Sequence, residues 1–401
     1  MNTPHHLLVN GLSIGSGGGY TVGRELARHL AQERAAWKVT LALAAGNPLH
    51  EQMRGEWWPD NCRLHWAPAG TSGRVARARY ESGALADWST RNGVTRVLQL
   101  NGMVIPALRV PTLAHYQDPW PYRREAWTRW KDRVVAYLKR REHARALRTA
   151  DCAGFTSAYL RDLICGHHGI TPRRAEVFYN GLPDPWLERA RGALPDWESR
   201  PMELVTVSNV GPYKRQYLVI QALPRLVRRP GFESMTYRIV GDCAPGYRDE
   251  LLELARGLGV ERHVILEGRV SDEKVREFLA RARCFVLMSV CESFGIPAVE
   301  AMTFGTPVVT SDCCAMPEVC GSAAQLCPVD DVDALADRIA AVMTTPSLAD
   351  ELRRNGAEQA QRFGWQPTAA RMAATLEEMH DRGAAPRPHA AASAAAAPVT
   401  R

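Results

Sequence analysis

The stretch "CESFGIPAVEAMTFGTPVVTSD", from Cys291 to Asp312, decides the fold class of this 401-residue chain. It follows the apolar run "CFVLMSV" and contains "GIPAVEAMTFG", which is typical of a helix with Pro297 in its first turn and Gly305 after its end. A second apolar run, "TPVVTSD", comes next. A buried strand, a helix and another buried strand in close succession predict a parallel sheet.

The same alternation is written twice along the chain. In the first half, "HLLVNGL", "KVTLALAA", "VTRVLQL" and "PTLAHYQD" predict strands, and "TVGRELARHLAQE" repeats Val22, Leu26 and Leu30 at helical spacing. In the second half, "MELVTVSNV", "MTYRIVGD" and "HVILEGRV" predict further strands. We therefore expect an α/β protein with two doubly wound domains.

Prolines and polar residues replace this periodicity between residues 182 and 201, so we place the domains at residues 1–185 and 186–365. Residues 383–401 are low-complexity Ala/Pro sequence, and we expect them to be disordered.

Charge is distributed unevenly over the chain. Residues 1–185 hold 25 Lys and Arg against 15 Asp and Glu, whereas the remainder holds 25 against 28. This asymmetry indicates an anionic partner for the first half: a membrane surface, a phosphorylated carrier or a nucleic acid. Segment 120–150 carries ten basic and three acidic residues among Trp and Tyr and predicts one long basic helix. Such a helix could lie on anionic lipid, bind nucleic acid or simply be solvated.

Other sequence features limit the cellular location that we expect and the cysteine and metal chemistry that is available. No apolar run reaches about 18 residues and the N-terminus lacks a signal-peptide pattern, so we expect a cytoplasmic protein. The ten scattered cysteines, without any C-x-x-C, predict reduced and mostly buried thiols. Cys165, His167 and His168 are the nearest approach to a metal site, but we interpret them as an ordinary loop.

The predicted strand-to-helix loop at Glu292 lies at the carboxyl edge of the sheet, where open α/β sheets bind ligands. The backbone amides at Phe294 and Gly295 belong to a helix N-terminus, which suits a diphosphate. Glu300 lies about a turn further along and suits the paired hydroxyls of a ribose. Glu292, nearer the mouth, suits the hydroxyls of a sugar.

Two nucleotide-binding classes are disfavoured. The glycine run at Gly15, Gly17, Gly18 and Gly19 places Tyr20 where a dinucleotide fingerprint needs its last glycine, so a nicotinamide dehydrogenase is a poor match. No G-x-x-x-x-G-K-[ST] occurs, which argues against a P-loop NTPase.

Together, "ESFGIPAVEAMTFGTPVVTSD…MPEV" resembles the E-x7-E signature of the family 4 glycosyltransferases, retaining enzymes of the GT-B fold. "FVLMSVCESFG" with Ser289, "LEGRVSDEKVREFLARAR" and "VFYNGLPDP" match as well, so the resemblance covers nearly the whole chain. It implies two Rossmann-like domains that face a central cleft. It also implies that the last helix, residues 366–382, crosses back to the first domain.

The resemblance assigns roles on the donor side. It implies that Glu300 contacts the nucleotide ribose and Glu292 the donor sugar, and that the loop of Arg269 and Val270 contacts the base. Lys214, in "SNVGPYKRQY", would neutralise the diphosphate, because a point charge on a flexible stem suits phosphate.

The sequence departs from the family pattern at one position. Asn209 stands where many members have an arginine, which removes one cation from the diphosphate site unless Arg215 or Arg269 compensates.

The resemblance also assigns the first domain to the acceptor. Gly17, Gly18 and Gly19 would form a glycine-rich loop that lets the backbone approach phosphate or acceptor. "TLAHYQDPWPY" places His115 and Asp118 just after a strand, and a family histidine lies there close to the reacting sugar. Asp118 would orient His115, contact the acceptor or cap the next segment.

Asp331 and Asp333 form a D-x-D pair that we interpret as helix capping, so no metal is expected.

The resemblance implies a retaining glycosyltransferase in cell-surface polysaccharide or lipopolysaccharide biosynthesis, and we expect it to need neither a metal nor a cofactor. It would transfer a sugar from a nucleotide-sugar donor to a glycan or lipid-linked acceptor. Segment 120–150 would contact the inner face of the cytoplasmic membrane, and no nucleic acid is expected. Two alternatives stay open: another GT-B activity (a phosphorylase or an inverting transferase), and a non-catalytic protein that binds anions or nucleic acid.

Overall fold

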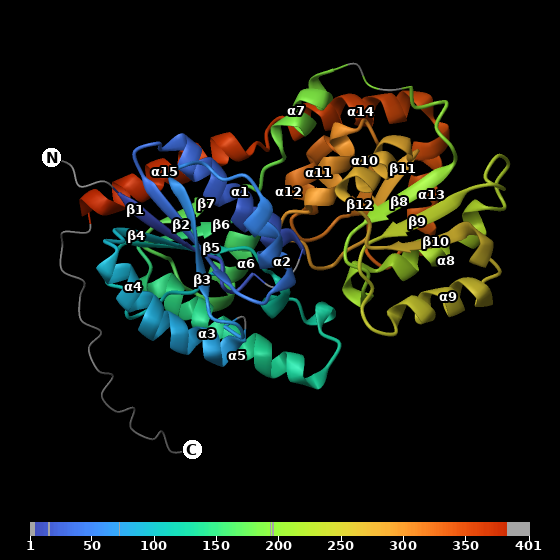
Figure 1. The fold of residues 1–401 in the computed structure, drawn as a ribbon. Coiled ribbons are helices and arrows are strands. Elements are labelled where there is room, and N and C mark those ends of the chain that lie inside the picture. Colours follow the sequence, from blue (N-terminus) through green and yellow to red (C-terminus); the bar gives the residue numbers. More distant parts are fainter. Residues whose placement is uncertain (1–4, 15–16, 72, 193, 195, 383–401) are drawn as a thin grey trace.

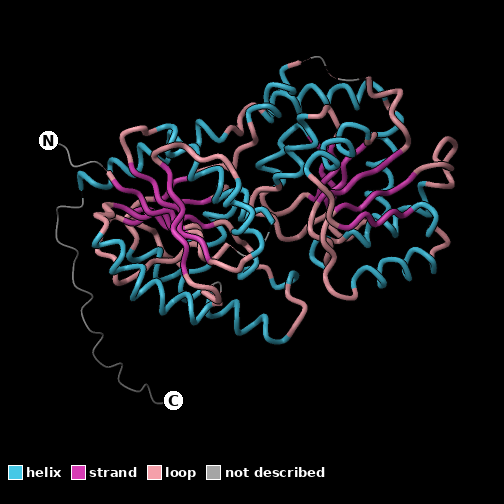
Figure 2. The backbone as a smooth tube through the Cα atoms, viewed as in Figure 1, coloured by secondary structure: helices cyan, strands magenta, loops and turns pink. Residues whose placement is uncertain are grey.

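A computed structural model describes residues 5–14, 17–71, 73–192, 194 and 196–382. The Ala/Pro tail at 383–401 lies outside this range. The chain forms two lobes (Figure 1), and each lobe is a parallel sheet with helices on both faces (Figure 2). This is the doubly wound pair of domains that the repeated alternation predicts.

The first sheet has the strand order β3-β2-β1-β4-β5-β6-β7, and all its recorded pairings are parallel. Its strands are β1 (His6–Asn10), β2 (Lys38–Ala44), β3 (Cys62–Ala67), β4 (Arg96–Gln99), β5 (Thr112–Tyr116), β6 (Cys152–Phe155) and β7 (Ala175–Val177). Among these, β3, β6 and β7 were not anticipated from the sequence.

The second sheet has the order β10-β9-β8-β11-β12-β13 and is also parallel. Its strands are β8 (Glu203–Val207), β9 (Thr236–Val240), β10 (Val264–Gly268), β11 (Cys284–Leu287), β12 (Val308–Ser311) and β13 (Ala324–Cys327). The strands β8 to β12 were all expected from apolar runs, whereas the short β13 was not.

The helices fall into the same two groups. Those of the first lobe are α1 (Gly17–Glu33), α2 (Pro48–Gln52), α3 (Arg74–Tyr80), α4 (Ala86–Arg91), α5 (Trp130–Thr149) and α6 (Ala158–His168). Those of the second lobe are α7 (Asp184–Arg191), α8 (Gln216–Leu226), α9 (Tyr247–Gly257), α10 (Asp272–Arg281), α11 (Ile296–Thr303), α12 (Met316–Cys320), α13 (Val332–Thr344) and α14 (Pro346–Ala360). Helix α15 (Trp365–Arg382) comes last in the chain and packs on the first lobe.

The last helix, α15, lies along the first lobe beside α1 (Figure 1). Its apolar side chains Trp365, Met372 and Leu376 are fully buried in the core of that lobe. The chain therefore passes from the second lobe back to the first, and the first core contains residues from both ends of the sequence.

Helix α1 packs its predicted apolar stripe, Val22, Leu26 and Leu30, into the same core. Gly23 permits the close approach, because a Cβ there would lie 2.5 Å from the Cδ1 atom of Ile14.

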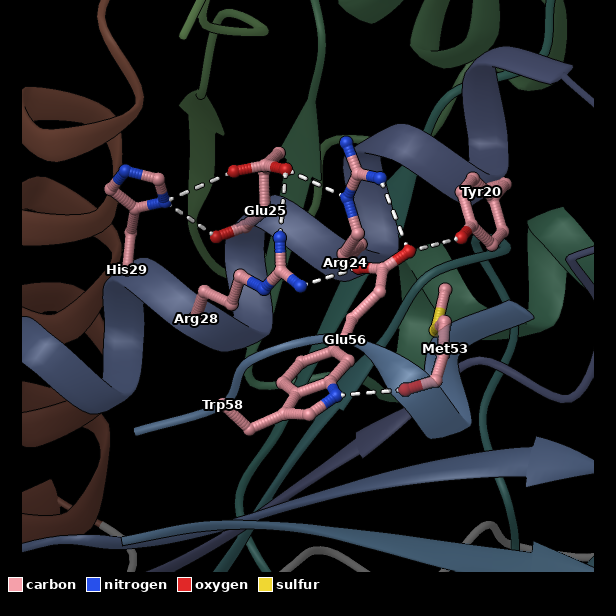
Figure 3. Close-up of polar contacts among 8 residues, drawn as sticks. All are labelled: Tyr20, Arg24, Glu25, Arg28, His29, Met53, Glu56 and Trp58. Carbon is pink, nitrogen blue, oxygen red and sulfur yellow. Dashed lines mark hydrogen bonds and ion pairs between the residues drawn. The ribbon is translucent and has the colours of Figure 1, made fainter. Parts of the chain in front are cut away.

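Ion pairs and hydrogen bonds hold the polar face of α1 against the segment at 53–58 (Figure 3). Arg24 and Arg28 both pair with Glu56, whose Oε1 also accepts a hydrogen bond of 2.8 Å from the Tyr20 hydroxyl. The guanidinium of Arg28 stacks on Trp58. This network fixes the helix that begins at the glycine run.

The basic segment differs from the prediction of one helix over 120–150. Helix α5 begins only at Trp130, and single 3-10 turns occupy Trp120–Tyr122 and Arg124–Ala126. Pro119 and Pro121 explain the difference, since a proline lacks an amide hydrogen and disfavours helix at the preceding residue. The carboxylate of Asp132 then accepts the amides of Thr128 and Arg129 and begins the helix.

Two further predictions need correction. The predicted linker contains helix α7, whose Leu187 is buried in the second core, so the boundary at 185–186 falls inside a helix. Cys165, His167 and His168 lie in the last turns of α6 rather than in a loop, because the side chain of Ser157 caps that helix and Gly169 ends it. All ten cysteines are free thiols, and six of them are buried, as predicted.

Candidate functional site

The site lies where the strand order of the second sheet reverses. Strands β8 and β11 are neighbours there, and the chain leaves their carboxyl ends in opposite directions. Lys214 follows β8 and Glu292 follows β11. Such a switch point is where open α/β sheets bind ligands, because the two following loops separate and leave a crevice.

A cavity of about 450 Å³ lies between the two lobes at this point. The second lobe lines it with Tyr213, Lys214, Cys291, Glu292 and Ser293, and the first lobe with Gln117, Asp118, Pro119, Trp120, Val135 and Lys139. We call it the first cavity. A second cavity of about 480 Å³ shares Trp120 and Tyr213 with it and reaches Asn209 and Asp242.

Lys214 and Glu292 form a buried ion pair in the first cavity. The Lys214 Nζ atom donates to Glu292 Oε1 at 2.5 Å, and the two side chains are only 13% and 10% exposed. Burial by itself lowers the pKa of Lys214, but the attraction to Glu292 outweighs it, so the pKa lies above its ordinary value. Lys214 is therefore a cation held inside a cavity.

Glu300 lies in α11, about one turn from its start. Burial, with a small contribution from Asp272, raises the pKa of Glu300 to about 7. This carboxylate is costly to ionise in the free protein, and a ligand that donates hydrogen bonds to it would relieve that cost.

The turn before α11 has the geometry expected from "SFGIP". Phe294 is buried against Phe363, with ring centroids 5.0 Å apart. Gly295 precedes the helix at φ +84°, and a Cβ there would lie 2.6 Å from the sulfur of Met316. Only glycine fits this position, so the α11 N-terminus can pack directly on the start of α12.

The two arginines proposed to compensate for Asn209 are engaged elsewhere. Arg215, in the left-handed region at φ +54°, pairs with Asp330, and the exposed Arg269 lies 3.4 Å from Asp242. Neither lines the two cavities. Val270 is half-buried against the second core.

His115 differs from the prediction. It lies within β5 rather than after it, is 1% exposed, and packs edge-on to Phe178. Burial lowers its pKa to about 4. The physical reason is that β5 continues to Tyr116, so the His115 side chain packs on the face of the sheet beside Phe178 instead of lying beyond the strand end.

Asp118 does line the first cavity. Its Oδ1 accepts the Trp120 amide at 2.9 Å, and its Oδ2 accepts Lys139 Nζ at 3.0 Å. Of the three roles considered for Asp118, this geometry matches the capping of the next segment.

The glycine run also differs from the predicted loop. Gly17, Gly18 and Gly19 form the first turn of α1. The Cβ position of Gly18 is open space, which leaves the backbone accessible as expected.

Asp331 accepts the Ala334 amide at 2.8 Å as the cap of α13, which confirms the capping interpretation. Asp333 pairs with Arg225. Within the described ranges, no group of three or more His, Cys, Asp and Glu side chains is arranged to hold a metal ion.

Sequence reasoning selected Asp118 but missed the other residues that the first lobe contributes to the cavity: Gln117, Pro119, Trp120, Val135 and Lys139. The mixture of aromatic and basic residues in segment 120–150 was the available signal. Because the sequence analysis treats that segment as one helix, it does not predict the turn that brings Trp120 to the cavity.

Two family models match this chain. The model described as Glycosyltransferase Family 4 matches residues 16–184, and the model described as Glycosyl transferases group 1 matches residues 195–359. Each match corresponds to one of the two sheets. The chain belongs to glycosyltransferase family 4. Its two lobes are the two Rossmann-like domains of the GT-B fold.

Individual relatives agree with this assignment. This chain is 34% identical over 161 residues to the O-antigen chain mannosyltransferase B of Escherichia coli, a match to 40% of this chain and 42% of that enzyme. The matched region thus spans less than half of the relative's length.

Solved structures extend the likeness to both lobes. Sucrose-phosphate synthase of Thermosynechococcus elongatus superposes with a TM-score of 0.77 at 19% identity, covering 94% of this chain and 100% of that one. Anabaena HepE, in complex with UDP and glucose, has a TM-score of 0.69 at 19% identity and covers 93% and 100%. These two likenesses show the shared fold.

Proposed function

We propose that this glycosyltransferase moves a sugar from a nucleotide-sugar donor to a hydroxyl group of a glycan or lipid-linked acceptor, with retention of anomeric configuration. The observation that carries the proposal is the buried Lys214–Glu292 pair in the cavity between the lobes. A cation in that place suits the diphosphate of a nucleotide sugar, and a carboxylate suits the hydroxyls of its sugar.

In the free protein each member of the pair neutralises the other. A donor diphosphate would attract Lys214, and Glu292 would then accept hydrogen bonds from the hydroxyls of the sugar. Charge develops on the diphosphate as the glycosidic bond breaks, so a fixed cation there stabilises the transition state. The α11 N-terminus adds backbone amides beside the same phosphates, and Glu300 would accept the ribose hydroxyls.

The proposal includes no metal ion. Lys214 and the helix N-terminus supply the positive potential that a divalent cation provides in other diphosphate sites. Turnover that is insensitive to a chelator is the corresponding test.

The acceptor side belongs to the first lobe, and the exposed face of α5 supports contact with a membrane. Trp130 is 74% exposed and Tyr137 57%, and Val134 lies between them. Lys131 and Arg133 interleave with these side chains. Aromatic and basic residues together suit the interface of an anionic lipid surface, so we propose that the enzyme works at the inner face of the cytoplasmic membrane. Among the helices that the structure describes, none is long and apolar enough to cross a membrane.

The test is donor-dependent release of nucleoside diphosphate over a panel of GDP-, UDP-, dTDP- and ADP-sugars, with a chelator present. GDP-mannose is the first choice, because the Escherichia coli relative is a mannosyltransferase. The anomeric configuration of the product, read by NMR, decides between retention and inversion. Turnover that needs inorganic phosphate would favour a phosphorylase and contradict the proposal.

A further inference from the structure

The loop between β12 and α12 carries two adjacent thiols, Cys313 and Cys314, beside the first cavity. Both are partly exposed. Cys314 has φ +59°, in the left-handed region that residues other than glycine rarely occupy. A cysteine in such a position is unusual, and strained backbone of this kind points to a possible role in function.

Each thiol is bonded to the segment that leads to Glu292. The Cys313 sulfur donates to the Ser289 carbonyl at 3.5 Å, and the Cys314 sulfur to the Val290 carbonyl at 3.1 Å. The amide of Ala315 adds a hydrogen bond of 3.4 Å to the carbonyl of Glu292. The position of Glu292 therefore depends on the position of the thiol loop.

The first lobe contributes a cation to the same place. Arg123 donates from Nε to the Val290 carbonyl at 3.0 Å, so its guanidinium and the Cys314 thiol share one acceptor. The adjacent Cys313 side chain lowers the pKa of Cys314 against the opposing effect of burial, and Tyr159 and Arg123 assist. The pKa of Cys313 is correspondingly raised. A thiolate next to an arginine is the usual setting of a reactive cysteine.

We propose that Cys313 and Cys314 form a redox-responsive dithiol at the joint between the lobes, oxidised by hydroperoxides. The Cys314 thiolate attacks hydrogen peroxide to give a sulfenic acid and hydroxide. The Cys313 thiol then displaces the sulfenic hydroxyl, so two thiols and one peroxide yield one disulfide and two waters.

The disulfide would be a labile one. Adjacent Cα atoms lie about 3.8 Å apart across a trans peptide, outside the range of about 4.4–6.8 Å for relaxed disulfides. Strained disulfides are easily reduced and serve as reversible switches rather than structural links.

Oxidation would loosen the loop from the cavity. Cys313 loses its hydrogen and can no longer donate to the Ser289 carbonyl. The hydrogen bond that protonated Cys314 makes to the Val290 carbonyl cannot re-form in the disulfide. The segment that carries Glu292 then loses two anchors, and we expect donor affinity to fall by about fivefold. This consequence, unlike the oxidation itself, rests on the proposed function.

The chemistry is tested by peptide mapping of the full-length reduced protein after hydrogen peroxide. Cleavage before Asp312 and after Glu318 releases the peptide DCCAMPE, which contains Cys313 and Cys314 and no other thiol. The proposal expects this peptide to lose about 2 Da and resist alkylation, and to regain two alkylation sites after dithiothreitol. A peptide that stays reduced, or that is cross-linked to Cys291, overturns it.

Variants assign the roles of the two sulfurs. Cys313→Ser should leave a Cys314 sulfenic acid that dimedone captures, and Cys314→Ser should abolish the peroxide reaction at this loop. Cys165→Ser, a partly exposed thiol in α6, is the matched control and should change neither result. With iodoacetamide at pH 7, Cys314 should react at least about threefold faster than glutathione, since each unit of lowered pKa gains more thiolate than it loses in nucleophilicity.

A donor-binding titration of reduced and oxidised protein separates this inference from the proposed function. If the reduced protein binds no nucleotide sugar while the peptide still oxidises, the proposed function fails and the dithiol stands. If oxidation proceeds but donor affinity is unchanged, the link between the loop and Glu292 is refuted.

Discussion

At the scale of single residues, the proposed donor site rests on the Lys214–Glu292 pair. Lys214→Met would remove the diphosphate cation and leave Glu292 buried without a partner. We expect turnover to fall about 100-fold and the free energy of unfolding to fall by about 3 kcal/mol. Donor assays and urea denaturation measure the two effects.

Lys214→Arg keeps the charge and should retain most of the stability. Lys274→Met removes a lysine that pairs with Glu277 on the exposed face of α10, and it should change neither quantity. Full turnover in Lys214→Met would contradict the assigned role.

Also at the scale of single residues, Glu300 makes the stability of the protein depend on pH. Its pKa is raised from 4.5 to about 7 because burial disfavours the charged form. Its contribution to stability is therefore complete below about pH 4.5 and is lost as pH rises through 7. Relative to wild type, Glu300→Gln should gain about 2 kcal/mol of stability between pH 5 and pH 8, allowing for partial exposure of the side chain.

Urea denaturation at pH 5 and pH 8 tests this prediction, with Glu253→Gln on the exposed face of α9 as control. An equal pH dependence in wild type and Glu300→Gln would show that the carboxyl group is not perturbed.

At the scale of elements, helix α5 presents an apolar and basic face that no part of the described chain covers. Replacing Trp130 and Val134 with Glu should reduce binding to anionic vesicles by about tenfold or more, because it removes apolar contact and adds two negative charges. Cosedimentation with phosphatidylglycerol vesicles measures binding, and phosphatidylcholine vesicles serve as the neutral comparison.

Both side chains are more than half exposed, at 74% and 52%, so the melting temperature should stay unchanged. Unaltered binding by the double variant would place the membrane contact elsewhere, or show that there is none.

At the scale of the whole molecule, Glu318 of α12 connects the two lobes. Its carboxylate accepts the amides of Ala158 and Tyr159 at the start of α6, at 2.7 and 2.8 Å, and the hydroxyl of Tyr179 at 2.9 Å. Glu318→Ala should cost about 2 kcal/mol and increase the radius of gyration, because charge-assisted bonds between the lobes are lost.

Small-angle scattering and thermal unfolding test this pair of effects. Glu351→Ala, on the exposed face of α14, is the control and should change neither. An unchanged radius of gyration together with lower stability would mean that Glu318 only caps α6.

The sequence by itself determined the class of fold and pointed to the residues of the proposed donor side. Alternating apolar runs and helical periodicity depend on local chemistry, and the E-x7-E spacing places Glu292 and Glu300 at opposite ends of one short turn and helix. The capping role of Asp331 is equally local, since a carboxylate at that position bonds the amide three residues on. These features need no knowledge of distant contacts.

Tertiary structure decided the rest. The enclosure of His115 depends on its neighbours across the sheet. The convergence of Lys214 with Glu292, and of Arg123 with Cys314, joins residues far apart along the chain. Such pairings follow from the strand order and the packing of the lobes, which no local pattern encodes.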